Sequence, residues 1–270
     1  MSDLKARALD PALTPFEQLR TIMAILRSPD GCNWDRSQTH TTLLPYLIEE
    51  AYEVLETVES GDFPSLREEL GDLLLQVVFH AQLAEEAGQF NLDDCVRTIV
   101  AKLIERHPHV FGEKKNLQPR EVRDQWEKIK TSSGEKPSVL AGLPRTMPAL
   151  TTAFRLGEKA AGVGFDWRNS TDALEKVREE LGEVSVAISD SSPDRKARLS
   201  GEIGDLLFAV ASVARLEGID PETALRRGLN KFRERFGRLE AELTGGGRRF
   251  EDFNLEQMEE VWQRIKRESS

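Results

Sequence analysis

The sequence predicts an all-α protein made of two tandem copies of a small helical bundle. Apolar residues recur every three to four positions along most of the 270 residues, and no segment alternates apolar and polar residues as a half-buried strand would. One acidic motif occurs twice. It reads Glu49-Glu50-Ala51-Tyr52-Glu53 with Glu69-Leu70-Gly71-Asp72, and then Glu179-Glu180-Leu181-Gly182-Glu183 with Glu202-Ile203-Gly204-Asp205. A duplicated motif in a chain of this length favours two domains.

The first half of the chain carries four long periodic segments and a shorter one. Thr14 and Glu17 have the spacing of a capping box with a proline between them, and Ser65 and Glu68 have the same spacing. Residues 28–38 are expected to form a loop. The expected helices are Pro15 to Arg27, Leu43 to Gly61, Ser65 to Gly88, Asn91 to Arg106 and, more briefly, Pro119 to Lys130.

The second half repeats this order after a segment rich in Gly and Pro, residues 131–148, which has the composition of a linker. We therefore expect an N-terminal domain over 1–130 and a C-terminal domain over 149–270. Asp220 is expected to cap a long helix that the glycines 245–247 end. The expected helices are Ala149 to Gly162, Thr171 to Ser189, Arg195 to Leu216, Pro221 to Leu243 and Leu255 to Lys266.

Composition excludes several classes of protein. The net charge of −10 argues against a nucleic-acid partner, because phosphate contacts need clustered Lys and Arg. Cys32 and Cys95 have no spacing typical of a disulfide framework or a zinc site, which favours a reduced cytoplasm. The N-terminus has no apolar signal core, and no apolar run approaches the ~20 residues of a membrane span. We expect a cytoplasmic protein that is neither exported nor a membrane partner.

The acidic residues of each copy are expected to converge. At about 100° per residue, Glu180 and Glu183 lie about 80° and 140° from the centre of their apolar stripe. Glu202 and Asp205 lie at about the same angles, in the same rotational sense, on the next helix. If the two helices pack antiparallel with their stripes inward, the four carboxylates meet on one side. The two stripes comprise Leu174, Val177, Leu181, Val184 and Ile188, and Leu199, Ile203, Leu206 and Val210. The same arithmetic applies to Glu50, Glu53, Glu69 and Asp72.

Four convergent carboxylates need a compensating cation, because their mutual repulsion raises their pKa values. All-oxygen ligation without a nearby histidine fits Mg²⁺, with Mn²⁺ as a possible substitute, whereas a di-iron bundle needs a Glu-x-x-His step. Gly71 and Gly204 interrupt good helix formers and predict the close approach of another group. A single Glu-x-x-Glu is normally a solvated helix face, and the duplication argues against that interpretation here.

Basic and aromatic residues also recur in order. A Lys and an Arg lie four residues apart at Lys102 and Arg106, and again at Lys231 and Arg235, so each pair shares a helical face. A tryptophan with a lysine one turn later follows near the end of each half, at Trp126 and Lys130 and at Trp262 and Lys266. Such groups can hold phosphate oxygens and pack a base or ribose. Taken singly, each is more often a surface charge or a core tryptophan, and it is their recurrence in the same order that indicates a shared site. His107 and His109 are expected in a helix-ending turn.

Taken together, the acidic doublets, the Lys-x-x-x-Arg and the Trp-x-x-x-Lys resemble the MazG family of nucleoside triphosphate pyrophosphohydrolases, over about Pro15 to Lys266. The tandem arrangement is similar to the two-domain bacterial members. The resemblance implies a homodimer with a house-cleaning or stress-related role. It also implies Mg²⁺-dependent hydrolysis of NTPs and dNTPs between the α- and β-phosphates.

The resemblance also implies a role for each matching residue. The implied metal ligands are Glu180, Glu183, Glu202 and Asp205, and in the first copy Glu50, Glu53, Glu69 and Asp72. The implied nucleotide ligands are Lys231, Arg235, Trp262 and Lys266, and in the first copy Lys102, Arg106, Trp126 and Lys130. We expect Glu179 or Glu49 to act as general base or to orient the metal ligands. The sequence leaves open which domain is active, although the arginine-rich helix of Lys231 slightly favours the second.

Two alternatives stay open. The chain could be a catalytically silent dimeric helical module that binds nucleotide or a protein partner. It could also be a phosphohydrolase that releases orthophosphate, although the absence of a Gly-x-x-x-x-Gly-Lys-Ser/Thr motif counts against a P-loop.

Overall fold

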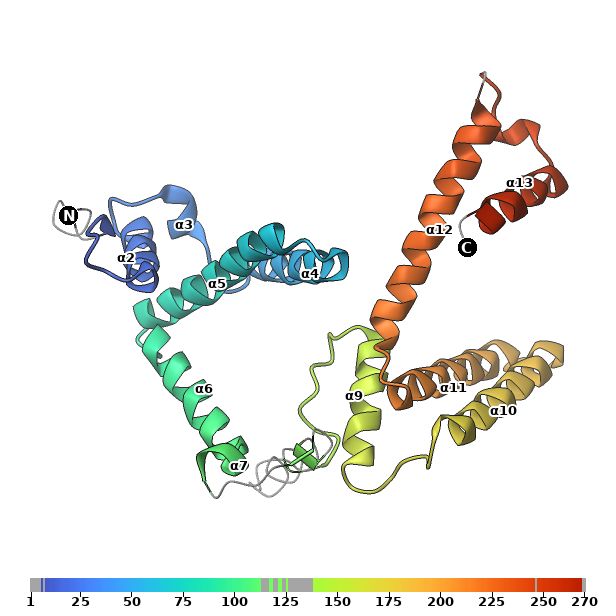
Figure 1. Cartoon of the computed structure of the whole chain (residues 1–270), viewed down its shortest axis with the longest axis horizontal. Coiled ribbons are helices and arrows are strands. Elements are labelled where there is room, and N and C mark those ends of the chain that lie inside the picture. Colours follow the sequence, from blue (N-terminus) through green and yellow to red (C-terminus); the bar gives the residue numbers. More distant parts are fainter. Residues whose placement is uncertain are drawn as a thin grey trace. The chain divides into compact units, whose positions relative to one another are not determined.

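The computed structural model describes residues 6, 8–112, 117–118, 121–122, 125, 138–245 and 247–268. Within these ranges the chain is helical and has no β-strand, which confirms the all-α prediction (Figure 1). The chain divides into two compact units, residues 1–116 and 117–270. The predicted domain limits at 130 and 149 stay a prediction, and the predicted helix 119–130 lies almost wholly outside the described residues.

The first unit is organised around a hairpin of two long helices, α4 and α5, which pack along each other (Figure 1). Helix α2 packs on α5, and α6 follows α5 through a short turn. The helices are α2 (Pro15–Arg27), α3 (Asn33–Ser37), α4 (Leu44–Ser60), α5 (Phe63–Glu86), α6 (Leu92–Arg106) and α7 (Pro108–Phe111).

The second unit contains the equivalent hairpin, formed by α10 and α11 (Figure 1). Helix α9 packs on α11, and α13 folds back on the long helix α12. The elements are α9 (Ala149–Ala161), α10 (Ser170–Ser189), α11 (Arg195–Leu216), α12 (Pro221–Thr244), the 3₁₀ turn η1 (Phe250–Asp252) and α13 (Leu255–Glu268). Among the described residues, no helix is both long and apolar enough to cross a membrane.

Local sequence signals set most helix ends. The Thr14 capping box is formed, because the Glu17 N–H donates to Thr14 Oγ1 at 3.3 Å and the Thr14 N–H donates to Glu17 Oε2 at 2.8 Å. Gly61 ends α4 in the left-handed conformation with φ 73°, which a side chain would disfavour. Asp220 caps α12, as predicted, by accepting from the Thr223 N–H at 2.7 Å.

Two local predictions are wrong. Helix α5 begins at Phe63 rather than Ser65, because the Asp62 carboxylate accepts from the Ser65 N–H at 3.3 Å and takes the capping position. The segment 28–38 is not all loop, because Asn33–Ser37 forms the single-turn helix α3. The Arg27 guanidinium donates to the carbonyl oxygens of Asp35 and Gln38 at the end of that turn, which supplies a donor to carbonyl groups at the C-terminal end of the helix.

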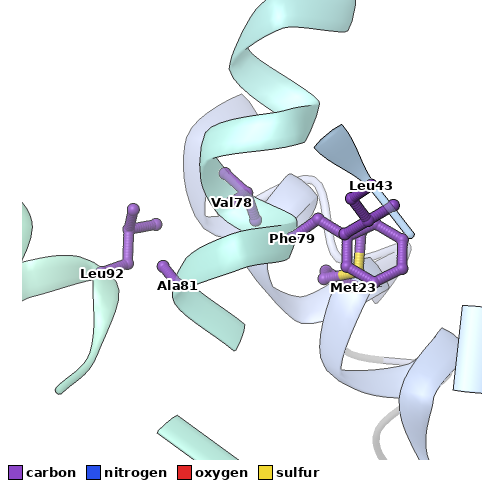
Figure 2. Close-up of a cluster of buried hydrophobic side chains, with 6 residues drawn as sticks. All are labelled: Met23, Leu43, Val78, Phe79, Ala81 and Leu92. Carbon is purple, nitrogen blue, oxygen red and sulfur yellow. The ribbon is translucent and has the colours of Figure 1, made fainter. Parts of the chain in front are cut away.

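The core of the first unit lies beside the C-terminal half of α5. It contains residues of α2 and α5, the first residue of α6, and the residue that directly precedes α4. These are Met23, Leu43, Val78, Phe79, Ala81 and Leu92 (Figure 2). Burying each of the larger side chains stabilises the fold by about 1.5–3 kcal/mol. This core anchors one end of α5, and the end that carries the acidic residues pairs with α4.

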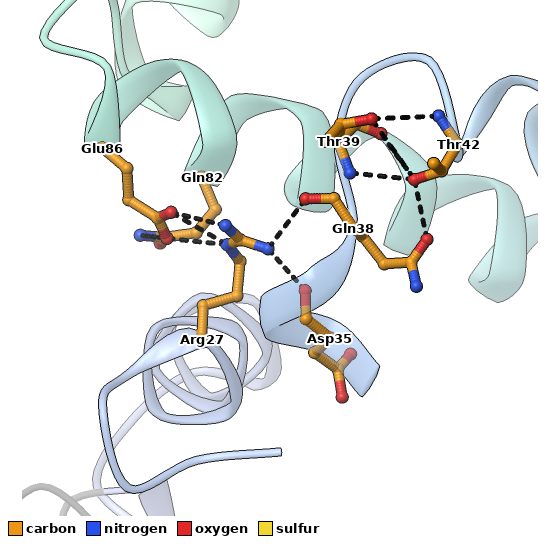
Figure 3. A network of polar contacts seen from close by, with 7 residues as sticks. All are labelled: Arg27, Asp35, Gln38, Thr39, Thr42, Gln82 and Glu86. Carbon is orange, nitrogen blue, oxygen red and sulfur yellow. Dashed lines mark hydrogen bonds and ion pairs between the residues drawn. The ribbon is translucent and has the colours of Figure 1, made fainter. Parts of the chain in front are cut away.

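A polar network around Arg27 ties α2 and α3 to α5 (Figure 3). The side chain of Arg27 is 9% exposed, and its Nη2 lies 2.7 Å from Oε2 of Glu86. Gln82 donates to the same carboxylate at 3.1 Å. These hydrogen bonds hold the pKa of Glu86 below its usual value, with Arg27 as the main cause.

The predicted direction of the apolar stripes on α10 and α11 is only partly right. Val184 and Leu206 are buried or half-buried, but Leu181 and Ile188 are 54% and 53% exposed, and Ile203 is 44% exposed. Glu180, by contrast, is 4% exposed. Much of each apolar stripe therefore faces away from the partner helix of the hairpin, and an acidic residue is buried instead.

Two candidate metal centres

The first candidate centre lies in the hairpin of α4 and α5. Glu50 on α4 and Glu69 and Asp72 on α5 offer carboxylate oxygens that all lie within 4.8 Å of one another. Residues three apart on a helix share a face, so the spacing of the motif brings each pair to the same side. Glu53 lies beside this group, because its negative charge raises the pKa of both Glu50 and Glu69. The structure therefore assembles the four acids that the pattern predicts.

The carboxylates of this centre repel one another. Partial burial raises the pKa of Glu50, and the charges of Asp72 and Glu53 raise it further. Loss of hydration also raises the pKa of Glu69, followed by the charges of Glu53 and Asp72. No cation forms an ion pair with these four acids in the described part of the chain. A bound divalent cation would relieve this repulsion.

The second candidate centre lies in the hairpin of α10 and α11. Glu180, Glu202 and Asp205 offer oxygens within 4.8 Å of one another. The charge of Glu180, and then a hydrogen bond with Glu202, raise the pKa of Glu183, which places the fourth acid beside them. Oε2 of Glu180 is buried and has no hydrogen-bond partner among the described residues. An orphaned buried carboxylate oxygen is unusual in a folded protein, and its position here fits a metal ligand.

One charged residue of this centre was not predicted from the sequence. The Lys176 ammonium lies 2.7 Å from Oε1 of Glu180 and 2.8 Å from Oε1 of Glu179. Both carboxylates raise the pKa of Lys176, the Glu179 hydrogen bond most. A lysine four residues before an acid on a helix is the signal that predicts such a pair.

The two residues predicted as general bases lie in different surroundings. Glu49 and Glu179 are both exposed on the helix turn before the last acid of their motif. Glu179 is bound to Lys176, and among the described residues no ion pair is formed by Glu49. Their catalytic role stays a prediction.

The predicted nucleotide ligands lie on other helices than the acids. Lys102 and Arg106 lie on α6, and Lys231 and Arg235 lie on α12. In the described residues, neither lysine forms an ion pair with the acidic groups. Their roles in binding nucleotide stay a prediction.

The structure describes the predicted nucleotide-binding tryptophan of the second unit. Trp262 is half-buried, and its ring centroid lies 5.4 Å from that of Phe232, next to Lys231. Trp262 thus packs against a cluster of Leu239, Leu243 and Ile265, and Lys266 lies exposed one turn later. Trp126 and Lys130 lie outside the described residues.

Neither predicted glycine contact is made by the residues that the structure describes. A Cβ at Gly71 or Gly204 would meet no atom of the described chain within 4 Å. His107 caps the C-terminal end of α6, in agreement with the predicted helix-ending turn, and Pro108–Phe111 then forms the short helix α7.

The fold and the acidic groups define a class of protein, a tandem all-α chain with a candidate divalent-cation centre in each repeat. The family model described as the MazG nucleotide pyrophosphohydrolase domain matches residues 38–111 and again residues 168–238. Each match contains one complete acidic set. The chain belongs to the MazG family.

Two named relatives match nearly the whole chain, and a third matches about half of it. The nucleoside triphosphate pyrophosphohydrolase/pyrophosphatase MazG of Thermotoga maritima is 45% identical over 253 residues, which cover 93% of this chain and 95% of that protein. The nucleoside triphosphate pyrophosphohydrolase of Escherichia coli K12 is 43% identical over 260 residues, 95% of this chain and 98% of that protein. The protein of the same name from Mycobacterium tuberculosis is 44% identical over 147 residues, 53% of this chain and 45% of that protein.

Proposed function

We propose that this protein hydrolyses nucleoside triphosphates and deoxynucleoside triphosphates between the α- and β-phosphates, with Mg²⁺ as cofactor. The observation that carries the proposal is the convergence of carboxylates within 4.8 Å in both hairpins. Relatives 43% and 45% identical over almost the full chain bear the name nucleoside triphosphate pyrophosphohydrolase. The products are a nucleoside monophosphate and pyrophosphate.

The donor set of each centre fits Mg²⁺, with Mn²⁺ as a substitute. Each candidate group consists of carboxylates alone, and neither contains a His or Cys. Hard oxygen donors suit Mg²⁺ and Mn²⁺ and suit Zn²⁺ or copper poorly. The buried, unpartnered Oε2 of Glu180 supplies a ligand atom that is otherwise unexplained.

The residues divide the chemistry between them. When bound, the cation would neutralise phosphate oxygens and lower the pKa of a bound water. The carboxylates hold the cation, and Lys231 with Arg235 neutralises charge that develops on the leaving pyrophosphate. Glu179, or Glu49 in the first domain, accepts a proton from the attacking water or orients the metal ligands.

Exposed apolar helix faces support a homodimer. Leu181 and Ile188 on α10, and Leu229 and Phe232 on α12, are each 48–54% exposed. Exposed apolar residues on a helix face mark an interface where they adjoin, and a second copy of the chain offers the same residues. We expect a solution mass near twice the 30.4 kDa of one chain.

We also propose a cytoplasmic location and no nucleic-acid partner. Cys32 and Cys95 are both free thiols in the structure, as a reducing compartment requires. The net charge of −10 opposes the phosphate backbone of DNA or RNA.

The products test the proposal. The purified chain is incubated with each dNTP and Mg²⁺, and the products are separated by ion-exchange chromatography. We expect monophosphate and pyrophosphate in equal amounts, and none when EDTA replaces Mg²⁺. Orthophosphate with diphosphate would overturn the proposed bond. Binding of dNTP without turnover would support the alternative of a catalytically silent module.

A further inference from the structure

One of the positions at which the two centres differ lies one helical turn before a glutamate that both motifs contain. In the second domain this position is Lys176, four residues before Glu180, and in the first it is Tyr46, four residues before Glu50. Residues with this spacing share a helical face. The same backbone position therefore carries a positive charge beside one acidic group and a neutral ring beside the other.

In the second centre, the lysine bridges two carboxylates. Its ammonium lies 2.7 Å from Glu180 and 2.8 Å from Glu179. The Glu180 side chain is 6% exposed, and a buried carboxylate is stable only with a counter-charge or hydrogen-bond donors. Lys176 supplies that counter-charge on Oε1, and Oε2 of Glu180 stays buried without a partner.

Within the described ranges, the first centre has no such counter-charge. The Tyr46 ring contacts Trp34 edge-on instead, with centroids 5.9 Å apart. Among the described residues, no Lys or Arg forms an ion pair with Glu50, Glu69 or Asp72. In the part of the chain that the structure describes, these carboxylates therefore have no counter-cation of their own.

We propose that Lys176 is a built-in counter-cation that competes with the metal, so that the second centre binds divalent cations more weakly than the first. The inference rests on the proposed function, which assigns a metal to both centres. A cation that approaches Glu180 either displaces the ammonium or binds beside it. Displacement costs an ion pair, and binding beside it costs charge repulsion. Lys176 is thus a positioning residue that keeps the second centre assembled while no metal is bound.

Binding of Mn²⁺ to the full-length chain tests this directly by electron paramagnetic resonance. Glu69→Gln with Asp72→Asn removes the first centre, so that the titration reports the second. In that background we expect Lys176→Met to tighten Mn²⁺ binding about tenfold, and Lys176→Arg, which keeps the charge, to leave the affinity close to that of Lys176. An unchanged or weaker affinity in a folded Lys176→Met chain overturns the inference.

The reciprocal exchange uses the first centre. Glu202→Gln with Asp205→Asn removes the second centre, and in that background we expect Tyr46→Lys to weaken Mn²⁺ binding about tenfold. Tyr46→Met, which removes the ring without adding charge, serves as control and is expected to leave the affinity unchanged. Equal affinities for Tyr46→Lys and Tyr46→Met overturn the inference.

Thermal unfolding without metal gives an independent readout. We expect Lys176→Met to lower the Tm in EDTA and to show a larger gain in Tm on adding Mn²⁺ than its Lys176 parent. If the second centre binds no Mn²⁺ with either residue at position 176, the proposed metal site itself fails. If it binds Mn²⁺ equally with both, only the role of Lys176 fails.

Discussion

Glu180 on α10 and Asp205 on α11 lie on different helices, and their carboxylate oxygens approach within 4.8 Å as part of one three-residue group. Like charges this close destabilise the hairpin unless a cation joins them. The relationship therefore links the stability of the fold to the proposed cofactor.

We predict that Mg²⁺ raises the Tm of the protein, because it binds the folded carboxylate groups and not the unfolded chain. Asp205→Asn and Asp72→Asn each remove one ligand and are expected to reduce this gain, which differential scanning fluorimetry measures. Asp194→Asn is the matched control, because Asp194 is an exposed acid that precedes α11 and lies outside both groups. A gain in Tm that neither ligand variant reduces contradicts metal binding at these groups.

We predict that Lys231→Met raises the KM for dNTP about tenfold, because a charge-assisted contact to a phosphate is lost. Arg233→Met is the control. Arg233 lies two residues away on another face of α12 and donates to Asn230 at 3.3 Å. Steady-state release of pyrophosphate gives KM and kcat for both. If the two variants changed KM equally, the assignment of Lys231 as a specific phosphate ligand would be contradicted.

The two stacked histidines of the first unit predict a loss of stability in mild acid. Nδ1 of His40 and Nδ1 of His80 lie 2.8 Å apart, and burial, followed by the charge of His40, lowers the pKa of His80 below 6.5. Because the folded pKa is depressed, the unfolded chain binds the proton more tightly. Stability is therefore lost as pH falls below 6.5.

Urea unfolding at pH 7.5 and pH 5.5 measures this loss. We expect His80→Gln to lose less stability between the two conditions than the wild-type chain does. An equal loss in both proteins would assign the acid sensitivity to other groups.

Arg27→Met is predicted to lower the free energy of unfolding by about 2 kcal/mol. The substitution removes the ion pair with Glu86 and the hydrogen bonds that Arg27 donates to the carbonyl oxygens of Asp35 and Gln38. Arg20→Met is the matched control, because the Arg20–Asp93 pair is 39% and 49% exposed and is expected to contribute less than about 1 kcal/mol. Chemical denaturation compares the two, and equal effects would contradict the role given to the Arg27 network.

Short-range signals explain how much of the fold was predictable. The Thr14 capping box and the Gly61 cap depend on residues within one turn of each other, so the sequence alone predicts them. The α5 start was missed because Asp62 and Ser65 both suit a cap, and only the folded chain shows which one is used.

The sequence predicts which acidic residues of the candidate site lie together, but it does not predict the burial and the charge of the residues around them. Spacing of three residues brings Glu50 and Glu53 to one face whatever the helix packs against. The direction of the apolar stripe was not predictable in the same way, because Leu181 and Ile188 are exposed in a single chain, as the proposed homodimer would require. Lys176 was overlooked because a helical lysine is normally solvated.

Release of pyrophosphate by the two aspartate variants tests the central claim most directly. The wild-type chain, Asp72→Asn, Asp205→Asn and the double variant are compared with dNTP and Mg²⁺. If the carboxylate centres perform the chemistry, at least one single variant loses activity about 100-fold or more, and the double variant releases no pyrophosphate. If the double variant, shown by circular dichroism to be folded, released pyrophosphate at the wild-type rate, the assignment of the active site to these carboxylates would be contradicted.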